Sequence, residues 1–131
     1  MDALCGSWKM VKSENVDDYL KALGHDDELR QIGNIVKPMI TISQDGDTVV
    51  VKTETSVKSS ESSFILGQEL DHTTIDNRNC KSVVYVDEGQ LVHVQKWDGN
   101  VTTITREVKD GQMIVTLTFE DAVAVCAYDR V

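Results

Sequence analysis

Three residues near the carboxyl end of the chain have side chains that could do chemistry. In the segment DAVAVCAYDRV, strand alternation places Cys126 and Tyr128 on one face. In the upstream segment VTTITREV, the same alternation places Arg106 on the face of Ile104. A thiol beside a phenol could serve redox chemistry, form half of a binding site or belong to a core. A guanidinium on an apolar face needs an anionic or polar partner, because burying an unpaired charge is costly.

Arg106 has two opposite interpretations at this stage. If the alternation continues unbroken, its side chain points inward, where an anionic or polar group must meet it. If a bulge shifts the alternation by one residue, Arg106 lies on the surface and pairs with a neighbouring acid, as long charged side chains usually do. The pattern of this one strand does not separate the two.

The other reactive side chains do not form a catalytic or metal-binding pattern. A nucleophile needs a nearby base, and alternation places no histidine beside Cys126. His25, His72 and His93 lack the spacing of metal ligands, so we expect surface or locally hydrogen-bonded histidines. We therefore expect no enzyme activity, no bound metal and no cofactor. The plainest interpretation of Cys126 is a small apolar residue in a buried wall.

Short strands joined by tight turns must position these residues. Runs rich in β-branched residues, such as SVVYV and MIVTLTF, alternate with turn signals. This rhythm indicates an antiparallel meander that closes into a sandwich or a barrel. The turn signals are Asp45-Gly46, Glu88-Gly89, Asp98-Gly99, Asp110-Gly111 and Glu120-Asp121.

A helical segment precedes most of these strands. Asn15 is a candidate N-cap, apolar residues follow it at helical spacing, and Gly24 is placed to end a short helix. A second helix with an acidic start must stop before Pro38. The pattern predicts a helical hairpin over about residues 15–37. The flanking strands are expected at about residues 6–12 and 39–43.

Composition and charge exclude several classes of protein. The 131 residues fit one domain, residues 1–131, and the balance of 22 acidic against 13 basic side chains argues against a nucleic-acid binder. The start of the sequence does not have the pattern of a signal peptide, and no apolar run is long enough to span a membrane. Three cysteines form no paired framework, which favours reduced thiols and a cytoplasmic location.

Several motifs occur in order along the chain: GSWKM at 6–10, DNR at 76–78, VQKWDG at 94–99, TTITRE at 102–107 and the late Tyr128. Together with the helical hairpin they resemble the intracellular lipid-binding proteins, especially the fatty-acid-binding proteins of heart, adipocyte and myelin type. The resemblance implies an all-β fold, a ten-stranded antiparallel up-and-down β-barrel of calycin type capped by a helix-turn-helix. It also implies a monomer that binds and transports a long-chain fatty acid or similar lipid in the cytoplasm, with the nucleus as a further compartment.

The resemblance assigns a head-group site that is incomplete in this chain. In the family, two inward arginines and a tyrosine meet the ligand carboxylate; Arg106 and Tyr128 match the first arginine and the tyrosine. The second arginine stands two residues before the tyrosine, where this chain has Cys126. Three possibilities follow: a fatty acid held mainly by Arg106, a less anionic ligand such as a retinoid, fatty alcohol, acyl amide or sterol-like molecule, or a ligand-free interaction protein. Arg130 does not match, and we expect it to be solvated.

Further positions follow from the resemblance together with strand alternation. The cavity is expected to be lined by Thr53, Thr55, Gln95, Ile104, Val115 and Leu117. The portal is expected to include Val16, Leu29, Val57 and Asp76, and its small side chains suggest a wide opening. Trp8 and Trp97 are expected to be packing residues. Basic residues of the helical lid could contact an anionic membrane transiently, although nearby acids weaken this attraction. They are Lys21, Arg30 and Lys37.

Overall fold

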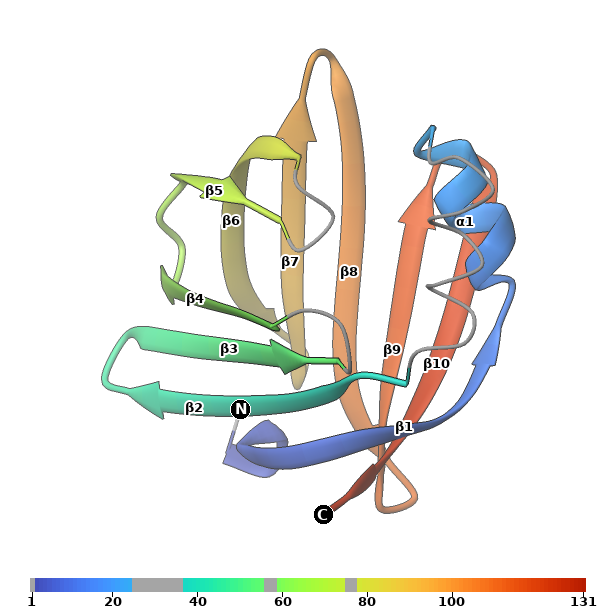
Figure 1. Cartoon of the computed structure of the whole chain (residues 1–131). Helices are drawn as coiled ribbons and strands as arrows, with labels where there is room; N and C mark the ends of the chain where they lie inside the picture. Colours follow the sequence, from blue (N-terminus) through green and yellow to red (C-terminus); the bar gives the residue numbers. More distant parts are fainter. Residues whose placement is uncertain (1, 25–36, 56–58, 75–77) are drawn as a thin grey trace.

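Ten antiparallel strands form one sheet that curls into a nearly closed barrel, as the computed structural model shows in Figure 1. The structure describes residues 2–24, 37–55, 59–74 and 78–131. The all-β, ten-stranded barrel that the resemblance implies is therefore confirmed. The strands are β1 Gly6–Glu14, β2 Met39–Asp45, β3 Thr48–Glu54, β4 Ser59–Ile65, β5 Leu70–Thr73, β6 Asn79–Asp87, β7 Gln90–Trp97, β8 Asn100–Lys109, β9 Gln112–Phe119 and β10 Ala122–Arg130.

The order of the strands leaves one seam in the barrel. The hydrogen-bonded order is β4-β3-β2-β1-β10-β9-β8-β7-β6-β5, so every pairing joins consecutive strands except that of β1 with β10. The two outer strands, β4 and β5, do not pair with each other. The side chain of His72 bridges this seam: its ring, on β5, is hydrogen-bonded to Ser62 on β4 through Nε2 at 2.8 Å and to Ser82 on β6 through Nδ1 at 3.1 Å.

The tight turns follow the sequence signals. The turns between β6 and β7, β7 and β8, and β8 and β9 each contain an acidic residue with positive φ followed by a glycine with positive φ. At the last of them, Asp110 has φ 54° and Gly111 has φ 79°. Two consecutive residues with positive φ match the twist of a two-residue hairpin, which is why a glycine is required at the second position.

Arg130 ties the end of β10 to the start of the chain. Its guanidinium donates hydrogen bonds to the carbonyls of Ala3 and Cys5 at 2.7 and 2.9 Å, and it lies 4.2 Å from the centre of the Trp8 ring. Gly6 has φ 130°, a backbone conformation that residues with a side chain rarely adopt, and a Cβ there would lie 2.5 Å from the Arg130 Nη1 atom. Arg130 is exposed, as expected, but the expectation did not include these partners, which come from the opposite end of the sequence. Trp8 is fully buried, as a packing residue should be.

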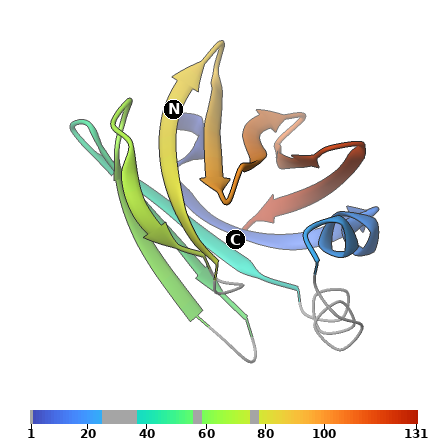
Figure 2. The ribbon, with the colours of Figure 1, turned by 90° about the horizontal axis from the view of Figure 1, so that it is seen from above.

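One described helix, α1 (Val16–Ala22), packs against β9 and β10 at one end of the barrel, beside the ring of strands seen in Figure 2. A single 3-10 turn, Asp2–Leu4, precedes β1. Asn15 occupies the N-cap position, but its backbone is left-handed and its side chain makes no capping hydrogen bond. Tyr19 anchors the helix, since its hydroxyl is hydrogen-bonded to Thr102 Oγ1 at 2.7 Å. The second helix of the expected hairpin falls mostly outside the described residues.

Candidate functional site

A cavity of about 300 Å³ lies inside the barrel. Its wall is built by side chains from α1 and from all the strands except β2 and β6, with Pro38 just before β2 and Arg78 just before β6. Strand alternation explains this composition, because every second residue of a barrel strand points inward. Most of the lining surface is apolar, and the polar side chains are concentrated on β3 to β8. Such a cavity suits an elongated apolar molecule with a polar group.

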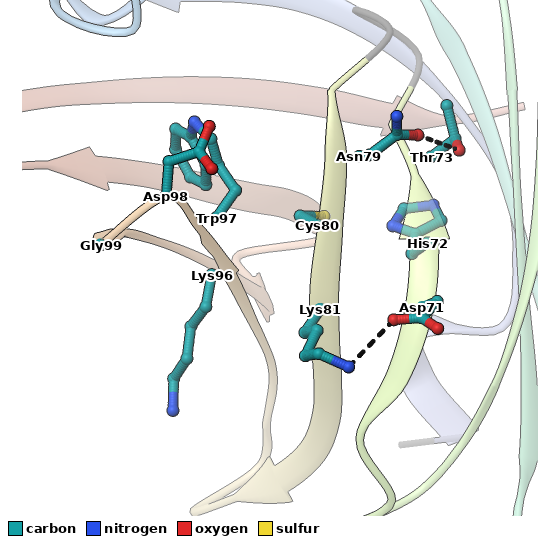
Figure 3. Close-up of a pocket in the computed structure, with 10 residues that line it drawn as sticks. All are labelled: Asp71, His72, Thr73, Asn79, Cys80, Lys81, Lys96, Trp97, Asp98 and Gly99. Atoms are coloured by element: carbon teal, nitrogen blue, oxygen red, sulfur yellow. Dashed lines mark hydrogen bonds and ion pairs between the residues drawn. The ribbon is translucent and has the colours of Figure 1, made fainter.

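A larger hollow of about 580 Å³ lies where β6 and β7 diverge, beyond their last pairing between Lys81 and Lys96. In Figure 3, Lys81 reaches across to Asp71, and the two form an ion pair of 3.1 Å. The charged side chains that line this hollow are exposed. Because this charge pair is solvated and internally matched, the hollow offers a ligand less than the barrel cavity does.

Arg106 points into the barrel cavity. The pairing of β8 with β7 and with β9 runs without a register shift, which excludes a bulge beside Arg106. The side chain is only 8% exposed, and it lines the cavity. Of the two interpretations of this arginine, the structure supports the inward one.

The charge of Arg106 is not neutralised by the described residues. Its Nε atom is buried without a hydrogen-bond partner among them, and none of their carboxylates lies within ion-pair distance. Burial lowers the pKa of Arg106, while Tyr128 opposes this effect. Because arginine stays protonated in proteins, the described cavity wall presents a cation that can still accept an anionic partner.

Tyr128 and Cys126 belong to the same part of the wall. Both are 4% exposed and both line the cavity. Burial, and then Cys126, raises the pKa of Tyr128, while Arg106 acts in the opposite direction. Burial also raises the pKa of Cys126 to about 11. At neutral pH the phenol is therefore a hydrogen-bond donor, and the thiol is neutral and a poor nucleophile.

The expectation for the histidines is wrong for His93. This residue is 4% exposed, lines the cavity, and its Nε2 atom has no hydrogen-bond partner among the described residues. Burial, with Arg106, His72 and Arg78 nearby, lowers its pKa to about 3. Its inward direction was available from the sequence, because His93 shares the parity of Gln95. His72 is locally hydrogen-bonded as expected, and His25 lies outside the described residues.

Arg78 is a second arginine of the cavity wall that the sequence analysis treated only as part of a motif. Its Nη2 atom donates to Oε1 of Gln95 at 3.2 Å, and its guanidinium lies 4.5 Å from the centre of the Trp97 ring. Trp97 in turn stacks on Phe119, consistent with a packing role. The available signal was parity, since Arg78 is two residues before the buried Cys80 of β6.

The structure brings most of the other expected cavity residues together. Thr53, Gln95, Ile104 and Leu117 line the cavity, and so does Val16 of the expected portal. Two expectations are corrected. Val115 is buried in the apolar core, where its backbone pairs with Arg106 on one neighbouring strand and with Cys126 on the other. Thr55 is half-buried and follows the last residue of β3. Three expected portal residues lie outside the described residues: Leu29, Val57 and Asp76.

The described part of the chain offers neither a metal site nor a membrane-spanning helix. It contains no group of three or more His, Cys, Asp or Glu residues that could hold a metal ion. None of the helices described there is long and apolar enough to cross a membrane.

Comparisons with known proteins agree with this geometry. The model of the lipocalin / cytosolic fatty-acid binding protein family matches residues 5–130. A solved REP1-NXSQ fatty acid transporter is similar at 38% identity and a TM-score of 0.96, covering 100% of this chain and 98% of that one. A Schistosoma mansoni fatty acid binding protein in complex with arachidonic acid is similar at 39% identity and a TM-score of 0.95, covering 100% of this chain and 98% of that one. The fluorescent protein UnaG is similar at 43% identity and a TM-score of 0.94, covering 99% of this chain and 98% of that one.

Proposed function

The chain belongs to the lipocalin / cytosolic fatty-acid binding protein family, and from this premise we propose that it binds and carries a long-chain fatty acid in its barrel cavity. The observation that carries the proposal is Arg106, a buried cation that has no ion-pair partner among the described carboxylates and lies in the wall of a mainly apolar cavity. Similar proteins that are described as a fatty acid transporter and as a complex with arachidonic acid support the same class of ligand.

The apolar tail supplies most of the binding free energy. Each CH₂ group that leaves water contributes about 0.8 kcal/mol, and this gain requires no specific contact. Residues from α1 and from β8 and β9 form apolar wall for such a tail, for example Leu20, Ile104 and Leu117. The tail alone does not explain selectivity between acids, alcohols and sterols.

The head group decides the selectivity. A carboxylate can accept charge-assisted hydrogen bonds from Arg106, which are about twice as strong as neutral ones, and the neutral phenol of Tyr128 can add a further donor. Cys126 supplies no charge at this point. A neutral ligand would fill the cavity and leave the arginine buried without an anion, which is the costlier arrangement. An acid is therefore favoured over a retinoid, a fatty alcohol, an acyl amide or a sterol.

We propose that the carrier acts as a monomer in the cytosol and exchanges ligand at membranes through the end of the barrel that α1 covers. Asp17 and Asp18 in the first turn of α1 offset the charge of Lys21, so electrostatic attraction of this helix to anionic lipid should be weak. Sedimentation with anionic vesicles at low and high salt tests the membrane contact, and size-exclusion chromatography with light scattering tests the monomer.

Titration with isotope-labelled oleate tests the binding itself. We expect saturable binding of one oleate per chain and a loss of about tenfold to a hundredfold in affinity for Arg106→Gln, since a hydrogen bond to a charged group contributes about 1.5–3 kcal/mol. The matched control is Lys109→Gln, which removes an exposed positive charge from the same strand. Oleyl alcohol and retinol should compete poorly. Equal oleate affinities of the native protein and Arg106→Gln would contradict the proposed anchor.

A further inference from the structure

His93 is a buried polar residue that gains no hydrogen-bond partner when a carboxylate binds at Arg106. Its side chain is 4% exposed, and it lines the same cavity as Arg106. Its Nε2 atom is buried without a hydrogen-bond partner among the described residues. Buried polar atoms are normally satisfied, so an unsatisfied one in a cavity wall requires a partner from the contents of that cavity.

The ring of His93 is held by its neighbours. The Phe64 ring centroid lies 4.8 Å from that of His93 at an interplanar angle of 62°, and the His72 ring lies 5.7 Å away. His72 uses its two nitrogen atoms for Ser62 and Ser82 across the seam of the barrel. The partner of His93 Nε2 is therefore not its neighbouring histidine.

His93 lies one step along the barrel from the proposed carboxylate anchor. On the paired strands β7 and β8, Leu91 pairs with Arg106 and His93 pairs with Ile104. His93 and Arg106 are thus diagonal neighbours, whose Cα atoms are typically about 7–8 Å apart. The step from Arg106 to His93 runs toward α1, because Tyr19 of that helix contacts Thr102, two residues beyond Ile104. An acid anchored at Arg106 whose tail runs toward α1 passes His93.

Hydroxyl groups also line the cavity that His93 faces. Ser60 and Ser62 of β4 and Thr53 of β3 line the same cavity with hydroxyl groups. The low pKa of His93, about 3, keeps the imidazole neutral at physiological pH, so Nε2 either donates or accepts one hydrogen bond. A hydroxyl can do both, and it therefore pairs with either tautomer. A plain hydrocarbon tail can do neither.

We propose that His93 is a specificity-determining residue that selects long-chain hydroxy acids, with the carboxylate at Arg106 and a hydroxyl of the chain hydrogen-bonded to His93 Nε2. This inference rests on the proposed function and narrows its ligand class. A cavity that binds a hydroxyl group of the fatty acid selects its ligand by chemistry, and not by the length of the hydrocarbon tail alone.

Competition titrations with stearate and a set of hydroxystearates, each with its hydroxyl at a different carbon, test the inference. We expect at least one isomer to bind the native protein about tenfold more tightly than stearate, as one further buried hydrogen bond allows. His93→Phe should abolish that preference, so that no isomer binds more tightly than stearate, while His93→Gln should restore part of it. The control is Lys96→Gln, an exposed position of the same strand that is not part of the cavity wall, and it should keep the preference.

Nitrogen NMR of the native protein gives a measurement that is independent of folding in the variants. The Nε2 resonance of His93 should shift with the preferred hydroxystearate and not with stearate. The inference is overturned if no isomer is preferred to stearate, or if His93→Phe keeps the preference. Failure of the proposed function has a different signature, in which neither stearate nor any hydroxystearate binds the native protein. Binding of hydroxystearates alone would support the role of His93 and exclude plain fatty acids.

Discussion

Arg106 and Cys126 occupy one row of the barrel, on β8 and β10, with Val115 of β9 paired to both. All three side chains are buried. The position that would carry a second arginine in the family pattern thus faces the same part of the cavity as the first one. The head-group site of this chain therefore has one cation where two could fit. We expect a second cation to raise the affinity for a fatty acid and to lower the stability of the ligand-free protein.

Restoring the second arginine should strengthen fatty-acid binding. We expect Cys126→Arg to raise oleate affinity about tenfold or more, because the carboxylate gains a second charge-assisted partner. The ligand-free protein should lose about 1–3 kcal/mol in its free energy of unfolding, since another buried cation lies near Arg106. Calorimetric titration and urea denaturation measure the two effects. Cys126→Ser is the control without a charge, and an unchanged oleate affinity of Cys126→Arg would count against the head-group site.

Removing the cation of Arg106 should stabilise the ligand-free barrel. Arg106→Met replaces a buried charge by an apolar side chain of similar length, and such replacements are often neutral or stabilising by about 1–4 kcal/mol. Urea denaturation of delipidated protein measures this change, with Lys109→Met as the exposed control. The same variant should lose the stabilisation that added oleate gives the native protein. A clear loss of stability in the delipidated variant would mean that Arg106 has an internal partner.

The free energy of unfolding should fall as the pH drops from about 6.5 toward about 3. His93 has a pKa of about 3 in the folded protein against an ordinary value of 6.5, so the unfolded chain binds a proton that the folded one excludes. Its contribution is fully present above pH 6.5 and is lost on acidification, on the order of 5 kcal/mol in all. Denaturation of the native protein and of His93→Phe over this pH range measures it. The variant should show the shallower dependence, and parallel curves would refute the assignment.

Loss of the Arg130 contacts should destabilise the barrel. Arg130→Ala removes two hydrogen bonds to backbone carbonyls and the contact with the Trp8 ring, which together are worth about 1–3 kcal/mol. Thermal unfolding followed by tryptophan fluorescence reports on this region, with Asp129→Ala as the exposed control on the preceding residue. An unfolding midpoint equal to that of the native protein would show that the contacts contribute little.

Local pattern predicted the barrel strands well where one face is buried. Alternation put Arg106 on the same face as Ile104, and the structure buries both, because a shift by one residue would expose a whole apolar face. The number of strands and the head-group hypothesis came from resemblance to a family, since turn rhythm alone is compatible with a sandwich as well as a barrel.

The misses have physical reasons. His93 does not have the spacing of a metal ligand, and its inward direction follows only from its parity with Gln95. Arg130 is exposed as expected, but its contacts with Ala3 and Cys5, which are 127 and 125 positions away, were missed because no local pattern reveals them. Asn15 stands where a cap was expected, but its left-handed backbone changes how the chain enters α1.

The pairing of β1 with β10 also sets an order for folding. The strands β1 to β4 and β5 to β10 form two meanders whose hairpins are local, and among the described strands the ladder that joins the two meanders is that of β1 with β10. Each hairpin can form as soon as its two strands have been synthesised, whereas the joining pair must wait for β10 to emerge from the ribosome. Closure of such a distant contact costs more chain entropy than any hairpin and favours slow folding. Until it occurs, β1 offers an unpaired edge to other chains, so molecular chaperones would matter most at that stage of synthesis.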